Sequence, residues 1–177
     1  IVRARTDPSS GALYVQRISD PADTAQWTAW TLLESGIAPG SQIALAWDGN
    51  VIQALFYVGA DWRTIHMRQS SDNGQTWSAA VTVATLVAGH TCAGLAATLN
   101  AGLATLYCFY ADEINGESTL YTTLRAESGG AWSAPQAWGR APAAGVSGLA
   151  VHGAGDTLQV VACADSLAVY SVAPADL

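Results

Sequence analysis

Residues 70–77 hold the local pattern that most restricts the fold of this chain. They read Ser-Ser-Asp-Asn-Gly-Gln-Thr-Trp and end in the large indole ring of Trp77. Asp72 can hydrogen-bond nearby backbone amides, and Gly74 can take the positive φ that such a turn needs. Trp77 offers an apolar ring to whatever lies beneath it. The segment therefore predicts a hairpin loop in which Asp72 accepts backbone amides and Trp77 is buried.

Trp77 is one of three tryptophans that recur along the chain. Trp27, Trp77 and Trp132 are separated by 50 and 55 residues (27 to 77, 77 to 132), and a small polar residue and an alanine follow each. A strand-like segment that ends in arginine precedes each tryptophan. We predict that these arginines occupy one position of a repeat and stack or pair between neighbouring repeats; they are Arg17, Arg68 and Arg125.

Each repeat also contains an apolar hairpin. Residues 43–57 hold two apolar runs around an Asp-Gly turn, and residues 92–110 and 148–163 repeat this arrangement. Apolar runs around such turns are typical of antiparallel strand pairs. One repeat therefore amounts to four strands. No stretch shows helical periodicity, and a β-sandwich is the structural alternative, although it would not explain the recurring tryptophan.

Five positions of the central segment match the pattern Ser-x-Asp-x-Gly-x-Thr-Trp: Ser70, Asp72, Gly74, Thr76 and Trp77. This pattern resembles the Asp-box (BNR) repeat of sialidases and many other β-propeller proteins. The resemblance implies an all-β fold, a β-propeller of four-stranded antiparallel blades, with about three and a half blades present. It also implies a structural role for the five residues, because the family's box lies on the propeller rim.

We expect residues 1–177 to form a single propeller domain or propeller fragment. Its two complete blades are expected at residues 40–87 and 90–140, and its partial blades at residues 1–35 and 145–177. The faces beside the gap are expected to be apolar. A longer polypeptide or a second copy would then be the partner that completes the ring.

Composition argues against several other partners. The formal net charge is −7, and the seven basic residues are all arginine without forming a cluster, so nucleic acid is not expected. Residues 73–111 carry no charged side chain, but the turn at residues 100–102 interrupts them, which favours paired strands over membrane insertion. No Cys/His spacing indicates a metal site, and no cofactor is expected.

Three cysteines allow two interpretations. Cys92, Cys108 and Cys163 can be buried thiols on strands, since free cysteine packs as a small apolar residue. Alternatively, Cys92 and Cys108 can form a disulfide across the turn between them.

Catalysis is not expected from the residues present. By resemblance, a sialidase needs three converging arginines, a Tyr/Glu nucleophile pair and an Asp acid/base, and the chain lacks the family's Phe/Tyr-Arg-Ile-Pro segment. The strands expected to line the propeller axis, at residues 43–47, 92–97 and 146–151, contain no charged residue. We therefore assign no catalytic residue. The acids expected to lie in turns are Asp48, Asp61, Asp112, Glu113, Asp156 and Asp165.

Binding is the function that the composition favours. Seven tryptophans and six tyrosines supply flat faces that can stack on sugar rings. Trp62 lies in a predicted turn with Asp61 and Arg63. Of the tryptophans, it is the one that we most expect to be exposed, and we expect these three residues to bind ligand. The sequence thus predicts a non-catalytic extracellular or cell-surface recognition or scaffold module, with a glycan as the expected ligand. The alternative is a fragment of a sialidase-like glycoside hydrolase whose catalytic residues lie elsewhere in a longer chain.

Overall fold

The computed structural model describes residues 1–20, 26–100, 102–140, 145–154, 157–163 and 167–172, and these form four antiparallel sheets. The first sheet contains β1 (Val2–Asp7), β2 (Ala12–Arg17) and β3 (Thr31–Ser35). The second contains β4 (Ala44–Trp47), β5 (Gln53–Val58), β6 (Thr64–Ser70) and β7 (Val81–Thr85). The third contains β8 (Thr91–Asn100), β9 (Thr105–Ile114), β10 (Glu117–Ala126) and β11 (Gln136–Arg140). The fourth contains β12 (Gly148–Ala154), β13 (Thr157–Cys163) and β14 (Leu167–Val172).

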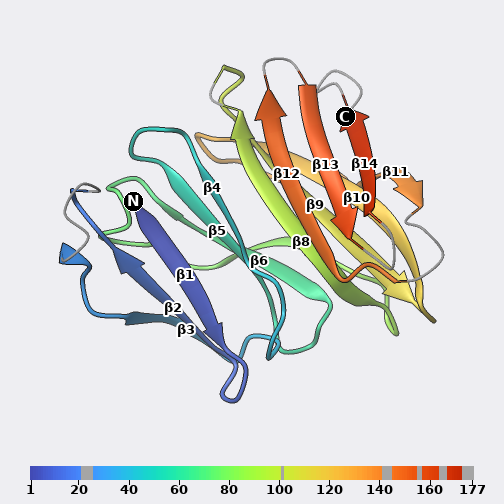
Figure 1. The fold of residues 1–177 in the computed structure, drawn as a ribbon, viewed down its shortest axis with the longest axis horizontal. Helices are drawn as coiled ribbons and strands as arrows, with labels where there is room; N and C mark the ends of the chain where they lie inside the picture. Colours follow the sequence, from blue (N-terminus) through green and yellow to red (C-terminus); the bar gives the residue numbers. More distant parts are fainter. Residues whose placement is uncertain (21–25, 101, 141–144, 155–156, 164–166, 173–177) are drawn as a thin grey trace.

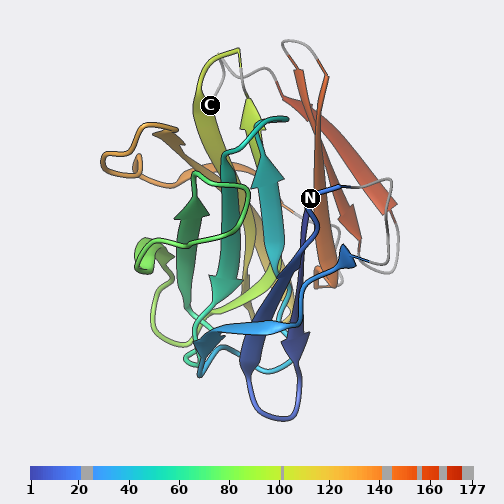
Figure 2. The same cartoon turned by 90° about the vertical axis from the view of Figure 1, so that its left-hand side faces the viewer.

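The four sheets follow one another in chain order (Figures 1 and 2). Within each sheet, the described strands pair antiparallel with their neighbours in sequence, and β8 contacts both β4 and β12. The expectation of an all-β chain with four-stranded antiparallel sheets is confirmed. No helix among the described residues has the length and hydropathy required to cross a membrane.

The second sheet shows how the sequence produces this arrangement. In the β4–β5 hairpin, the Asp48 carboxylate accepts the backbone N–H groups of Asn50 at 2.7 Å and Ile52 at 3.0 Å. All six residues of β5 are buried. Side chains alternate between the two faces of a strand, so Phe56 packs toward the third sheet and Leu55 toward the first. The core therefore lies between successive sheets.

Two repeated tryptophans fill these spaces between sheets. Trp77 packs with Leu13 and Val15 of the first sheet, and it is partly buried, short of the full burial expected. Trp132 packs edge-on against Phe56 of the second sheet, with ring centroids 5.8 Å apart. Each of these tryptophans therefore faces the sheet that precedes its own in the sequence.

Three equivalent hydrogen bonds align the repeats. The residue after each repeated tryptophan donates its backbone N–H to a carbonyl on the strand that precedes the tryptophan, which is β2, β6 or β10. The pairs are Thr28 to Arg17, Ser78 to Gln69 and Ser133 to Leu124. Arg68 comes one residue before this position and Arg125 one residue after it. The prediction of a single repeat position for the arginines was therefore wrong, because sequence spacing could not show this offset.

Two of the arginines nevertheless pair between sheets, as expected. Arg68 Nη2 lies 2.6 Å from Glu34 Oε2 of the first sheet, forming an ion pair. Arg125 Nη2 donates to Gln69 Oε1 of the second sheet at 2.8 Å. Both arginines contact the sheet that precedes their own.

The cysteines are all free. Cys92 lies opposite Asp112, and Cys108 lies opposite Ala97, so the register separates the two thiols that could have formed a disulfide. Both are buried, and burial raises the pKa of Cys92 to about 12, which keeps it a thiol. Cys163 is exposed, so the expectation of three buried thiols was wrong for it.

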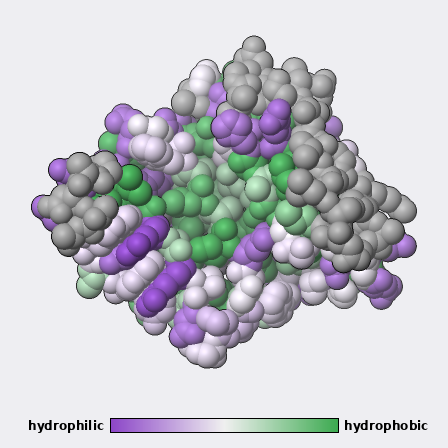
Figure 3. Space-filling model, viewed as in Figure 1, coloured by the Kyte–Doolittle hydropathy of each residue, from purple (hydrophilic) through white to green (hydrophobic). Residues whose placement is uncertain are grey.

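Two surfaces of the first and second sheets border the gap expected in the propeller, and they differ in polarity. Leu45 and Trp47 of β4 are 36% and 51% exposed, in agreement with an apolar surface there. Figure 3 shows hydrophobic side chains gathered in the middle of this view of the molecule. The outer face of the first sheet, however, carries the exposed Arg3 and Arg5. The expectation of apolar faces was therefore wrong for this face.

Candidate functional site

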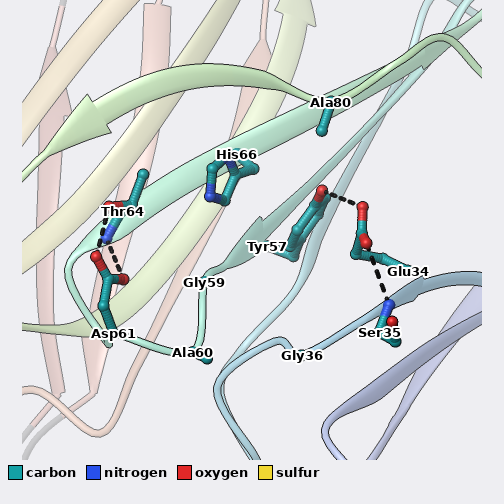
Figure 4. A pocket seen from close by; sticks show the side chains of 10 residues that line it. All are labelled: Glu34, Ser35, Gly36, Tyr57, Gly59, Ala60, Asp61, Thr64, His66 and Ala80. Carbon is teal, nitrogen blue, oxygen red and sulfur yellow. Dashed lines mark hydrogen bonds between the residues drawn. The ribbon is translucent and has the colours of Figure 1, made fainter.

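A pocket of about 370 Å³ lies between the first and second sheets, where β3 ends and β5 turns into β6 (Figure 4). Its walls combine carboxylate, hydroxyl and imidazole groups with an aromatic ring. The lining residues are Glu34, Ser35, Gly36, Tyr57, Gly59, Ala60, Asp61, Thr64, His66 and Ala80.

Tyr57 and Glu34 join the two sheets at one wall of this pocket. The Tyr57 hydroxyl donates to Glu34 Oε2 at 3.0 Å, and Arg68 pairs with the same oxygen. Burial, together with the hydrogen bond to Glu34, raises the pKa of Tyr57 to about 12. Burial works to raise the pKa of Glu34, but hydrogen bonds from Arg68 and Tyr57 outweigh it and lower that pKa.

These shifts decide what the pair can do chemically. A tyrosine nucleophile needs a neighbouring base that can take its proton. Here the phenol stays protonated, and the Glu34 carboxylate already carries an ion pair with Arg68, which makes it a weak base. Tyr57, Glu34 and Arg68 therefore form a polar contact that joins the first and second sheets.

Asp61 lines the opposite wall of the pocket and organises the β5–β6 turn. Its carboxylate accepts the backbone N–H groups of Arg63 at 3.0 Å and Thr64 at 2.9 Å, and the Thr64 hydroxyl at 2.7 Å. Burial would raise the pKa of Asp61, but these hydrogen bonds lower it to about 2. Asp61 is therefore ionised at neutral pH and is a poor proton donor.

The structure does not bring Trp62 and Arg63 into this pocket with Asp61. Trp62 has a positive φ of 59°, and it is 38% exposed. Arg63 Nε instead donates to the carbonyl of Leu86 at 3.3 Å. The expectation that Trp62 is exposed is confirmed, and Trp47 is exposed as well.

The Asp-box residues form a self-contained loop. Asp72 accepts the backbone N–H groups of Gln75 at 3.0 Å and Thr76 at 2.9 Å, and its other oxygen accepts the Thr76 hydroxyl at 2.6 Å. Hydrogen bonds from Thr76 lower the pKa of Asp72 to about 2. Gly74 has φ of +76°, and a Cβ at this position would clash with Val2 of the first sheet. Ser70 Oγ accepts the Gly74 N–H at 2.8 Å, which completes the loop.

The prediction that the other acidic residues lie in turns was wrong for two of them. Asp48 and Asp61 do lie in turns, but Asp112 and Glu113 lie within β9, and Asp156 and Asp165 are outside the described residues. Asp112 Oδ1 is 2.8 Å from His90 Nδ1, a pair that sequence reasoning missed. In the described part of the chain, no group of three or more His, Cys, Asp or Glu side chains could hold a metal ion.

Sequence reasoning also missed Glu34, Tyr57 and His66 as pocket residues. Tyr57 reads as part of an apolar strand, and Glu34 comes from the preceding repeat, so their meeting depends on how two sheets pack. The His66 ring lies 5.5 Å from the Tyr57 ring, centroid to centroid. The one available signal was that Glu34 is the only charged residue between the first repeated tryptophan and β4.

No family model matches the sequence, and no curated protein matches it. Several solved structures resemble its fold. A Hadza microbial sialidase, Hz136, aligns with 91% of this chain and 38% of its own at a TM-score of 0.64 and 12% identity. The SapL1 lectin, solved in complex with alpha methyl fucoside, aligns with 97% of this chain and 58% of its own at a TM-score of 0.57 and 16% identity. The NanB sialidase from Streptococcus pneumoniae aligns with 90% of this chain and 26% of its own at a TM-score of 0.51 and 15% identity.

At these identities the similarity concerns the fold. Sialidase and lectin neighbours fit a propeller made of antiparallel sheets, as the four sheets of this chain do. The chain spans less than two thirds of the length of each of these three neighbours.

Proposed function

We propose that this chain is a non-catalytic carbohydrate-recognition module and part of a β-propeller. The observation that carries this proposal is the pocket between β3 and the β5–β6 turn, which presents hydrogen-bonding groups beside an aromatic ring. Its volume of about 370 Å³ falls within the usual range of about 300–1,000 Å³ for small-molecule sites. Hydroxyl-rich ligands need such polar groups, and the Thr64 hydroxyl and the His66 ring supply them here.

The state of the pocket's ionisable groups supports binding over hydrolysis. Glycoside hydrolysis uses two carboxyl groups on either side of the bond, one of them protonated. Glu34 is paired with Arg68, and Asp61 holds three hydrogen bonds of its own turn with its pKa lowered to about 2. Neither carboxyl group fits the role of a proton donor, so the pocket is suited to hold a ligand unchanged.

A glycan array with the purified chain tests this proposal, and a pocket-filling variant locates the site. Ala80 is exposed and lines the pocket, so Ala80→Trp fills it without disturbing the core. Ala79→Trp is the matched control, because Ala79 lines a different groove, with Met67 and Arg125. Glycan binding that Ala80→Trp abolishes and Ala79→Trp preserves is the expected result. Absence of binding to every glycan, or equal binding by both variants, would reject the pocket as the site.

A second candidate is a fragment of a sialidase-like glycoside hydrolase. The similarity to two sialidases, of which this chain matches 38% and 26%, favours it. In that case the catalytic residues lie elsewhere in a longer chain. Turnover of a fluorogenic sialoside by a longer polypeptide containing residues 1–177, but not by these residues alone, would support this candidate.

We also propose that another segment completes the first sheet. β5, β9 and β13 each pair with two strands, whereas β1 pairs only with β2 in the described chain. On β8, the side chains that face the preceding sheet, such as Leu95 and Leu99, are buried, but Leu45 and Trp47 of β4 remain exposed. A further polypeptide segment or a second copy would cover them. Light scattering checks this, because a stable monomer of 18.3 kDa that binds no hydrophobic dye would contradict it.

We place the module outside the cell or at the cell surface, where glycans are abundant ligands. Fractionation of the native host with an antibody against this chain tests the location. Recovery in the cytosolic fraction would reject it.

A further inference from the structure

The outer face of the first sheet departs from the repeat at several positions that meet in space. The aligned hydrogen bonds make Gln16, Arg68 and Thr123 equivalent, and their cross-strand partners are therefore equivalent too. Those partners are Arg3 of β1, Leu55 of β5 and Cys108 of β9. Two residues later on the same strands lie Arg5, Tyr57 and Tyr110, which form a second equivalent set. The later sheets bury apolar or aromatic side chains at both positions, whereas the first sheet exposes two arginines.

A third departure lies next to these arginines. Trp30 follows the repeated Trp27 by three residues, and the equivalent residues after Trp77 and Trp132 are Ala80 and Pro135. The added indole is therefore not required by the repeat. Because departures from a structural repeat that converge on one place need a local reason, this cluster is a candidate site.

The two arginines and the aromatic rings form a continuous stack. The Arg3 guanidinium carbon lies 4.1 Å from the centroid of the Trp27 ring and 5.3 Å from that of Trp30. The Arg5 guanidinium carbon lies 4.4 Å from the Trp30 centroid and 5.5 Å from that of Tyr14. Cation–π contacts at these distances hold guanidinium groups over aromatic rings while leaving their N–H groups available.

Gln16 fixes the position of Arg3. Arg3 Nε donates to Gln16 Oε1 at 2.8 Å, and the Gln16 amide nitrogen donates to the backbone carbonyl of Thr28. Among the described residues, neither Arg3 nor Arg5 has a carboxylate partner, although the chain has 14 acidic and seven basic residues. The two cations are thus held in place with no anion from the described chain. Figure 3 shows strongly hydrophilic side chains over the β1 side of the molecule.

We propose that this face, made by Arg3, Arg5, Trp27 and Trp30, binds the carboxylate of an acidic saccharide. A guanidinium matches a carboxylate with two parallel hydrogen bonds, and the indole rings offer flat apolar surface to the sugar ring. The proposal rests on the proposed carbohydrate-recognition function, but it names a second site and a ligand class. In a completed propeller an adjoining sheet would bury these guanidinium groups, and burying a charged group without an anion carries a large desolvation cost. The described residues supply no such anion, so one is needed here in that case as well.

The test uses galacturonic acid and its uncharged methyl ester as a matched pair of probes. Binding is followed through the indole N–H signals of Trp27 and Trp30 in NMR spectra, assigned with Trp→Phe variants. We expect the acid to shift both signals and the ester to bind at least tenfold more weakly, since charge-assisted hydrogen bonds are lost. Arg5→Gln should weaken binding of the acid about tenfold or more.

Arg17→Gln is the control for general electrostatic attraction. It removes the same charge from the same sheet, but Arg17 lines a groove with Gly74 and Trp77. We expect it to leave binding of the acid within about twofold of wild type, and thermal melts confirm that each variant is folded. Equal losses in Arg5→Gln and Arg17→Gln would overturn the proposal, as would equal affinity for acid and ester.

Two further outcomes separate this proposal from others. Sulfate or acetate that shifts both indole signals as strongly as galacturonic acid would show a plain anion site and overturn the saccharide assignment. Glycan binding that Ala80→Trp abolishes, without any change at Trp27 or Trp30, would reject this site and retain the proposed function. Failure of every glycan to bind would reject both.

Discussion

The side-chain oxygen of Gln42 accepts the backbone N–H of Leu149 at 3.3 Å, across 107 residues of sequence. The same oxygen accepts the N–H of Leu95 at 2.9 Å. Gln42 lies just before β4, Leu95 lies in β8 and Leu149 lies in β12. One uncharged side chain thus links the segment before β4 to the first strands of the two following sheets.

We expect Gln42→Ala to destabilise the fold by about 1–3 kcal/mol, because it leaves two partly buried N–H groups without their acceptor. Gln42→Glu keeps the accepting oxygens and should lose much less. Urea denaturation measures both, with Gln136→Ala at an exposed position as the background control. Equal stability of Gln42→Ala and Gln136→Ala would show that the hydrogen bonds of Gln42 do not stabilise the fold.

Trp77→Ala should cost about 3–5 kcal/mol, as large-to-small changes in a core do, since the ring packs between the first two sheets. Trp47→Ala serves as the matched control, because that ring is 51% exposed, and it should cost much less. Guanidinium chloride denaturation followed by circular dichroism gives both values. A loss below about 1 kcal/mol for Trp77→Ala would contradict the packing role.

Acid should destabilise the chain through Asp61 and Asp72. Both have a pKa lowered to about 2 from the ordinary aspartate value of 3.8, so both bind protons more weakly in the folded state. Their contribution to stability is therefore complete above about pH 4 and is lost as the pH falls toward 2. Thermal melts across this range should show a steep decline for wild type and a shallower one for Asp72→Asn. Identical pH dependence of the two proteins would contradict the role of Asp72.

The Glu34–Arg68 ion pair should contribute about 1 kcal/mol or less, because both side chains keep contact with solvent. A double-mutant cycle with Glu34→Gln and Arg68→Gln isolates this coupling energy. It should shrink further in 1 M salt, where charges are screened over about 3 Å. A coupling that does not change with salt would show that hydrogen-bond geometry, and not charge, joins the two sheets.

We expect residues 1–177 to show no hydrolysis of sialosides or aryl glycosides. The Tyr57 pKa of about 12 and the ion-paired Glu34 leave the pocket without a nucleophile and base that can act at neutral pH. A fluorogenic assay, compared with a buffer blank, measures this. Turnover that Glu34→Gln abolishes would contradict the expectation.

The sheets were predictable because their signals are local. Asp48 and its following glycine mark a hairpin within a few residues, and the spacing of Trp27, Trp77 and Trp132 reveals a repeat without any three-dimensional information. The all-β, antiparallel arrangement follows from these two patterns.

The site residues were less predictable because they depend on contacts between repeats. Glu34 and Tyr57 meet only when the first two sheets pack together. The arginines at the ends of three similar segments looked equivalent, and only the backbone hydrogen bonds reveal that they occupy different positions. Arg3 and Arg5 were not recognised as departures, since the repeat alignment of the first strand requires its register with β2.

Trp77 and Trp132 both face the sheet that precedes their own, and this gives the row of sheets a direction. The two ends of the row of sheets are therefore chemically different. A two-fold axis that passes through one end of the row would place like ends together and would require an interface that the chain does not otherwise make. A rotation about the axis around which the sheets are arranged, a two-fold one included, would place unlike ends together and could reuse the existing contact. If copies of this chain associate through these ends, cyclic assemblies are the ones that its own packing favours.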